Sequence, residues 1–204
     1  MEDESDIYYT VKKGSEGMYK EKGSKFPSYL IPIESEEELK ALIEALKKEH
    51  PNSRHFCYAF RLGELGDVYR YSDDGEPSGT AGKPIYGQLL SHNLTNVGLV
   101  VLRYFGGTKL GVSGLIHAYK ESSTDAINQA QILKKFIGKH FRLDYPYEAT
   151  NSVTQLLHRF DYEVKDQIFD EKCRQDIFIR ETQASQFYSM VTKIKEVSVS
   201  DISK

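Results

Sequence analysis

The sequence predicts an α+β protein of two domains. Segments with the period of a strand and segments with the period of a helix alternate along its 204 residues, and this pattern restarts after residue 132. The length suits one large domain or two small ones. We place the domains at residues 1–134 and 135–204, and the second has the strand–helix–strand–strand–helix–strand order of a ferredoxin-like fold.

In the first half of domain 1, strands are expected over residues 8–33, 55–63 and 67–71, where apolar and polar residues alternate. Between the first two of these, residues 35–50 predict a helix. Ser35 and Glu38 form a capping box at its start, and apolar residues recur along one face. This half of the domain is therefore a small antiparallel sheet interrupted by one helix.

The second half of domain 1 predicts two more helices around a buried strand. Pro84 suits the start of a helix, which should turn Ile85, Leu89 and Leu90 inward. Residues 96–105 form the most apolar strand and should lie centrally in the sheet. The last helix is expected over residues 112–130, with Leu115, Ala118, Tyr119 and Ala126 toward the core.

Domain 2 carries a regular pattern of its own. Strands are expected over residues 136–145, 162–170, 173–181 and 197–202, and helices over residues 148–160 and 182–196. Together they complete the ferredoxin-like order.

Composition indicates an ordinary globular protein, with 39% hydrophobic and 28% charged residues. The net charge of −3 gives no overall attraction to nucleic acid, so any basic surface must be local. The first ten residues lack the basic and apolar regions of a signal peptide, and no apolar run is long enough to span a bilayer. Two distant cysteines fit free thiols in a reducing compartment. We expect a cytoplasmic protein without membrane contact.

The loop YSDDGEPSGTAGKPI, residues 71–85, is the first candidate site. Its glycines do not have Walker A spacing, but they lead to Lys83 at a helix start, where free amides favour an anion. Ser78 and Thr80 could add hydroxyl donors. The acids Asp73, Asp74 and Glu76 could instead bind a divalent cation, or cap turns and pair with arginines.

The turn RYFGGTKLG, residues 103–111, is a second strand–glycine–helix unit with a lysine. Gly106 and Gly107 permit positive φ and so a concave group of backbone amides. Arg103, Lys109 and Lys120 could flank it, with His117 on the first turns of the helix. The alternative is that the glycines serve tight packing and that Arg103 is buried against Asp73 or Asp74.

A nucleophilic enzyme is a further alternative, because His55 and Cys57 lie on one face of the same strand. The sequence contains no nucleophile elbow and no catalytic cysteine signature, however. A cysteine on an apolar strand is usually a core residue.

Two segments of the sequence resemble the signature of the IMPACT/YigZ family: YSDDGEPSGTAGKPIYGQL and NVGLVVLRYFGGTKLGVSGLIHAYKES. The resemblance covers most of residues 1–130, and the tail is similar to the second domain of the bacterial members. It implies that domain 1 is an α+β sandwich similar to domain IV of elongation factor G, with a left-handed βαβ crossover. It also implies that domain 2 is similar to domain V of that factor.

The resemblance further implies a link to translation. The eukaryotic branch of the family is linked to translational control through a regulator of an initiation-factor kinase. That branch has an additional N-terminal partner-binding domain, which is not expected here, so the kinase-linked role is not carried over. For the bacterial type the resemblance suggests association with nucleic acid or the ribosome. In the family pattern G-G-L-x-R-A-Y, this chain has Ser113 and His117 in place of a glycine and the arginine.

We therefore expect a non-enzymatic RNA- or ribosome-associated protein that binds phosphates at both glycine-rich turns, with no cofactor and no metal. Tyr104 or Phe105 would stack on a base if exposed. An enzyme acting on a small phosphorylated or carboxylated substrate, and a protein-interaction module using the second sheet, remain alternatives. The oligomeric state is left open. The expected anion- or RNA-binding residues are Ser78, Thr80, Lys83, Arg103, Gly106, Gly107, Lys109, Ser113, His117 and Lys120, and the expected turn, ion-pair or metal residues are Asp73, Asp74 and Glu76.

Overall fold

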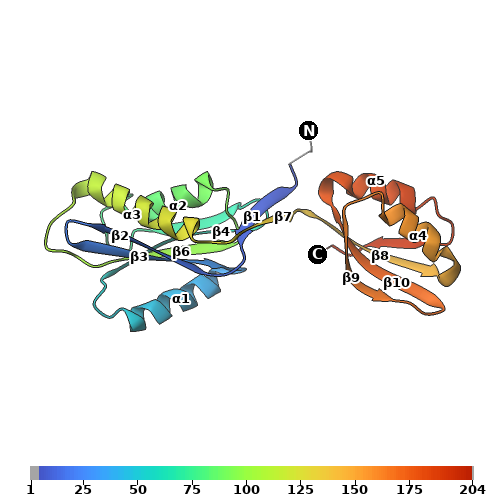
Figure 1. Ribbon diagram of the computed structural model, residues 1–204, viewed down its shortest axis with the longest axis horizontal. Helices are drawn as coiled ribbons and strands as arrows, with labels where there is room; N and C mark the ends of the chain where they lie inside the picture. Colours follow the sequence, from blue (N-terminus) through green and yellow to red (C-terminus); the bar gives the residue numbers. More distant parts are fainter. Residues whose placement is uncertain (1–4, 204) are drawn as a thin grey trace. The chain divides into compact units, whose positions relative to one another are not determined.

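Two compact units make up the computed structural model, which describes residues 5–203. One unit contains residues 8–135, and the other combines residues 5–7 with residues 136–203. Residues 1–4, part of the N-terminus on which the absence of a signal peptide was predicted, lie outside the described residues. Both units mix helices and strands, which confirms the α+β class (Figure 1).

A five-stranded antiparallel sheet with the order β2-β3-β6-β4-β5 forms the centre of the first unit. Its strands are β2 (Ser15–Glu21), β3 (Ser24–Pro32), β4 (His55–Leu62), β5 (Val68–Ser72) and β6 (Val97–Arg103). The predicted apolar strand is β6, which lies in the middle and is buried from Val97 to Leu102. Strands β1 (Ile7–Val11) and β7 (Ile132–Phe136) pair in a separate two-stranded sheet.

Helices cover both faces of this sheet (Figure 1). Helix α1 (Glu36–Glu49) packs against one face through Leu39, Ile43 and Leu46. Helices α2 (Gly82–Ser91) and α3 (Gly111–Asn128) pack against the other face. The expected inward residues of α3 are buried, whereas Leu90 on α2 is 46% exposed. Helix α2 packs against β4 and α3, and Leu90 is exposed at the last residue but one of this helix.

The strand directions place both glycine-rich turns at one end of the sheet. Strands β5 and β6 each run antiparallel to β4, so they are parallel to each other. The loop of residues 73–81 after β5 and the turn of residues 104–110 after β6 therefore leave from the same end. Strands β3 and β4 begin there, because each is antiparallel to β6. The left-handed crossover implied by the resemblance stays a prediction.

The second unit has the predicted ferredoxin-like topology, with a four-stranded antiparallel sheet in the order β11-β8-β10-β9. Helices α4 and α5 lie on one face of it (Figure 1). Its elements are β8 (Gly138–Pro146), a 3₁₀ turn (Tyr147–Ala149), α4 (Thr150–Leu157), β9 (Tyr162–Ile168), β10 (Lys172–Arg180), α5 (Glu181–Val191) and β11 (Ser198–Asp201). Leu143, Ile177 and Phe187 are fully buried between sheet and helices.

Asp6 belongs to this second unit, although the sequence-based division placed it in the first domain. Its carboxylate forms a buried ion pair with Arg180 and accepts a hydrogen bond from the Thr182 hydroxyl at 2.7 Å. The hydrogen bonds from Arg180 are the main reason that the pKa of Asp6 falls to about 2. The segment before β1 is thus held at the start of α5.

None of the helices formed by the described residues combines the length and apolar character of a membrane span.

Candidate nucleic-acid interface

The carboxylate of Asp73 occupies the start of α2. Its Oδ1 accepts hydrogen bonds from the backbone N–H groups of Ala81 at 2.9 Å and Gly82 at 2.8 Å. Its Oδ2 accepts one from Gly79 at 2.8 Å. Three of the amides around the helix start, including that of its first residue Gly82, are therefore already satisfied by an acid of the same loop. The loop is built around its own carboxylate, as the turn-capping alternative required.

Glu76 and Arg103 form a buried ion pair that joins the loop to the end of β6. The Nη1 atom of Arg103 lies 2.7 Å from Oε1 and 3.0 Å from Oε2 of Glu76. The Tyr119 hydroxyl on α3 donates a further hydrogen bond to Glu76, at 3.0 Å. Burial of Arg103 was one of the two expectations, but its partner is Glu76 and not Asp73 or Asp74. Its charge is therefore largely neutralised within the protein.

The third acid, Asp74, is also used by the fold. Its carboxylate accepts the backbone N–H of Phe56 at 2.7 Å, and its carbonyl accepts a hydrogen bond from Nδ1 of His55 at 2.8 Å. A carbonyl oxygen can only accept, so Nδ1 carries the proton and Nε2 is the remaining nitrogen of His55. Asp74 thus fastens the loop to the start of β4.

The loop supports neither of the two alternatives, a metal site and a nucleophilic enzyme. Among residues 5–203, no group of three His, Cys, Asp or Glu side chains is placed to hold a metal ion. Cys57 is buried, its thiol lies 3.0 Å from the Asp73 carbonyl, and burial raises the pKa of this thiol. His55 hydrogen-bonds Asp74 and not Cys57. The nucleophilic alternative therefore has no His55–Cys57 hydrogen bond to support it, and Cys57 is a core residue as expected.

In the second turn, Gly106 has a packing role. A Cβ atom there would lie 2.0 Å from the carbonyl carbon of Gly23, and the Gly106 N–H donates to the Ser24 hydroxyl at 3.1 Å. Gly107 differs, because it has a φ of 87° and open space around it. Only part of the expected group of amides is therefore available to a ligand.

The other predicted residues divide by exposure. Thr80 is buried, and its hydroxyl donates to the Pro77 carbonyl at 2.7 Å. The side chains that remain at the surface are Ser78, Lys83, Lys109, Ser113, His117 and Lys120. His117 lies 3.8 Å from Glu121, so part of its surroundings is acidic.

Five exposed cations lie on segments that meet at the turn end of the sheet. Lys22 and Lys25 flank the β2–β3 hairpin, and Arg54 precedes β4. Lys83 follows the loop of residues 73–81, and Lys109 lies in the turn of residues 104–110. Within the described part of the chain, none of the five takes part in an ion pair, and neither α2 nor α3 has an acid in its first turn. We call this surface the basic end of the sheet.

A cavity of about 570 Å³ opens at the basic end, beside Arg103. It is lined by Asn52, Arg54, His55, Arg103, Tyr104 and Phe105. Phe105 is 60% exposed, whereas Tyr104 is half-buried and its hydroxyl lies 2.7 Å from Nδ1 of His50. Asn52, Arg54 and His55 were not predicted for this interface. Antiparallel pairing of His55 with Arg103 brings them there.

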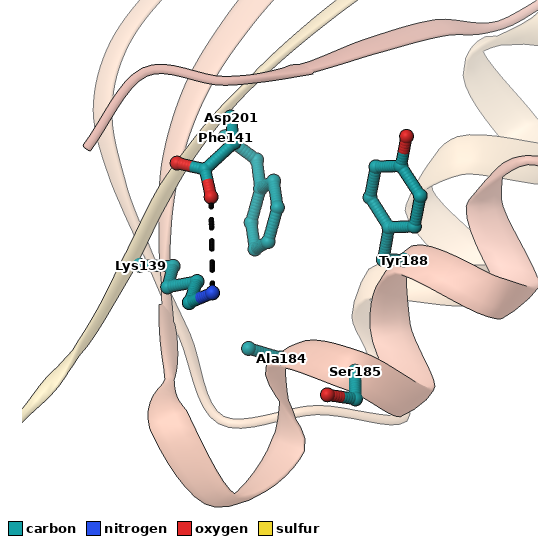
Figure 2. A pocket seen from close by; sticks show the side chains of 6 residues that line it. All are labelled: Lys139, Phe141, Ala184, Ser185, Tyr188 and Asp201. Atoms are coloured by element: carbon teal, nitrogen blue, oxygen red, sulfur yellow. Dashed lines mark ion pairs between the residues drawn. The ribbon is translucent and has the colours of Figure 1, made fainter.

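A second cavity, of about 400 Å³, lies in the other unit between α5 and the sheet (Figure 2). Lys139 reaches into it beside Phe141 and faces Asp201, whose carboxylate lies 3.9 Å from the ammonium group. Ala184, Ser185 and Tyr188 from α5 complete the lining. One cation and one anion cancel here, so this cavity offers no excess charge to a polyanion.

The helix-free face of the second sheet is charged. Arg142 pairs with Asp176 at 2.6 Å, and Arg174 pairs with Asp144 at 2.8 Å. These pairs lie across neighbouring strands β8 and β10. A protein-interaction surface of the kind expected for this sheet would need an exposed apolar patch. Here the ion pairs lie next to Ile168 of β9, which pairs with Arg174 and is 52% exposed.

Comparison with known proteins places these features in a family. The model of the Impact N-terminal domain matches residues 22–127, which include strands β3 to β6, both glycine-rich turns and most of α3. A crystal structure described as that of a hypothetical protein has a TM-score of 0.66 and 26% identity, and the match covers 98% of each chain.

Curated relatives match the chain beyond the first unit as well. IMPACT family member YvyE of Bacillus subtilis (strain 168) is 30% identical over 92% of this chain and 86% of the relative. An IMPACT family member of Haemophilus influenzae is 36% identical over 84% of both chains. YigZ of Escherichia coli (strain K12) is 36% identical over 69% of this chain and 70% of its own. The chain therefore belongs to the IMPACT family.

Proposed function

We propose that this protein binds RNA through the basic end of the sheet, as a non-enzymatic factor associated with the ribosome and with translation regulation. The RNA backbone would lie across the β2–β3 hairpin and the two glycine-rich turns. Lys22, Lys25, Lys83 and Lys109 would contact phosphates, and the exposed ring of Phe105 would stack on a base.

The observation that carries this proposal is the separation of charge at the basic end. The loop acids Asp73 and Glu76 are directed into the fold, where they accept hydrogen bonds from amides, Arg103 and Tyr119. The lysines of the same segments are exposed. A protein with a net charge of −3 thereby presents a local cationic surface, which is what phosphate binding needs.

The same contacts weigh against the enzyme alternative. A general base or a metal ligand must be able to reach a substrate, but each of the three loop acids is engaged by the protein itself. The cavity at the basic end is lined by none of these acids. The link to translation rests on the family, whose eukaryotic branch is associated with translational control.

The test is fluorescence anisotropy of labelled single-stranded and duplex RNA with the purified protein. The variant Lys83→Glu/Lys109→Glu should bind the RNA much more weakly, since two phosphate contacts become repulsive. The control Lys193→Glu/Lys195→Glu makes the same change in net charge at exposed positions of the second unit. If both variants lose RNA binding equally, the effect is one of overall charge and not of these two lysines. If the unaltered protein does not bind RNA at low salt, direct RNA recognition is excluded.

A further inference from the structure

Three side chains that line the cavity at the basic end are held in place by residues that do not line it. Arg103 is held by Glu76 at 2.7 Å, and His55 by the Asp74 carbonyl at 2.8 Å. The Tyr104 hydroxyl is held by His50 at 2.7 Å. Each of these partners lies outside the lining of the cavity. Side chains locked in this way lose little conformational entropy when a ligand arrives, which is the property of a preformed site.

The polar groups of the cavity suit an anion. The Arg54 side chain is exposed, and no ion pair neutralises it in the described part of the chain, so the cavity carries an excess positive charge. The Arg103 side chain is only 10% exposed, and its Nε–H group is buried without an acceptor. The side-chain amide of Asn52 can donate a hydrogen bond to the ligand.

The aromatic side of the cavity suits a planar ring. Phe105 is 60% exposed, and the centre of its ring lies 5.6 Å from the Arg103 guanidinium carbon. An exposed phenylalanine next to a cation offers a stacking surface for a base. The volume of about 570 Å³ falls within the range of small-molecule sites.

We propose that this cavity binds one nucleotide with a terminal phosphate, with the phosphomonoester at Arg54 and the base against Phe105. The second negative charge of a monoester, which an internal phosphodiester lacks, gives the excess positive charge a stronger partner. An RNA end and a free mononucleotide present the same chemistry. For an RNA end, the inference rests on the function proposed above.

The experiment compares three labelled single-stranded RNAs of one sequence, with a 5′-phosphate, a 3′-phosphate or hydroxyl groups at both ends. One phosphorylated RNA should bind about tenfold more tightly than the hydroxyl-ended one, and AMP should compete for that difference. Arg54→Gln should remove the preference, and Phe105→Ala should weaken competition by AMP. Arg159→Gln, an exposed arginine of the second unit, is the matched control and should keep the preference. Melting temperatures show that each variant is folded.

Three outcomes separate this inference from the proposed function. RNA that binds equally well with all three ends, without competition by AMP, overturns the inference and leaves RNA binding in place. If the unaltered protein binds none of the three RNAs, the proposed function is overturned. Calorimetry with AMP then tests the nucleotide site by itself. Binding of AMP that Arg54→Gln abolishes supports a site for a free mononucleotide, and absence of AMP binding overturns that as well.

Discussion

Glu76 and Arg103 are joined by two contacts, at 2.7 and 3.0 Å, across the gap between a loop and the end of the central strand. Both side chains are at least nine-tenths buried. Replacing Arg103 with Ala should leave the Glu76 charge buried without its partner and cost about 3 kcal/mol of unfolding free energy. Urea denaturation measures this cost.

The matched control for this pair removes both charges. Arg103→Met/Glu76→Leu should recover much of the lost stability, because no uncompensated charge remains in the interior. If Arg103→Ala alone costs less than about 1 kcal/mol, the pair is not the link between loop and strand that we infer.

Asp73 fills the start of α2, so its removal should create a vacant anion position. Asp73→Ala deprives the Gly79, Ala81 and Gly82 amides of their acceptor and should destabilise the protein by about 2 kcal/mol. Inorganic phosphate should then stabilise the variant more than the unaltered protein, because the anion binds the freed amides. Thermal melts with and without phosphate measure the difference, and equal stabilisation of both proteins contradicts the assignment.

The lowered pKa of Asp6 makes the stability of the second unit depend on pH. Its pKa is lowered to about 2 in the folded protein from an ordinary value of 3.8. A lowered pKa contributes stability that is fully present above the ordinary value and is lost as pH falls through the window between about 4 and 2. Asp6→Asn should be less stable at neutral pH and should show a smaller acid-dependent loss. Hydrogen exchange of α5 amides as a function of pH measures this, and identical profiles would contradict the inferred pairing with Arg180.

Two glycines of the first unit should respond in opposite ways to the same change. Gly106→Ala places a Cβ atom 2.0 Å from the backbone of Gly23 and should cost about 2–3 kcal/mol. Gly87 lies within α2 with open space around it, so Gly87→Ala should stabilise by roughly 0.5–1 kcal/mol. Denaturation of the two variants side by side tests this. A neutral Gly106→Ala would show that the turn of residues 104–110 does not pack as closely against the β2–β3 hairpin as described.

Elements with strong local signals could be predicted from the sequence. The helix start at Ser35 follows from a capping box, and the hydroxyl of Ser35 accepts the backbone N–H of Glu38. The burial of β6 followed from its apolar composition, and the order of elements in the second unit followed from periodicity. The pairing of β1 with β7 could not be foreseen, because two five-residue strands far apart in sequence carry little local pattern.

The site was predicted less completely, for a physical reason. A carboxylate next to free helix amides is typical both of a loop that caps itself and of one that binds an external anion, and only the hydrogen bonds of Asp73 distinguish the two. Arg54 belongs to no recognisable motif. It lies at the cavity because β4 pairs with β6 in a register that sets His55 opposite Arg103. That register depends on the whole sheet and not on the residues around Arg54.

The salt dependence of RNA binding tests the central claim most directly. For single-stranded RNA, the slope of log K against log salt changes by about 0.7 for each phosphate contact. Lys83→Glu/Lys109→Glu should therefore flatten the slope by at least about 1.4, while Lys193→Glu/Lys195→Glu should leave it nearly unchanged. A slope that is the same in both variants, or no salt-dependent binding at all, would contradict an RNA interface at the basic end of the sheet.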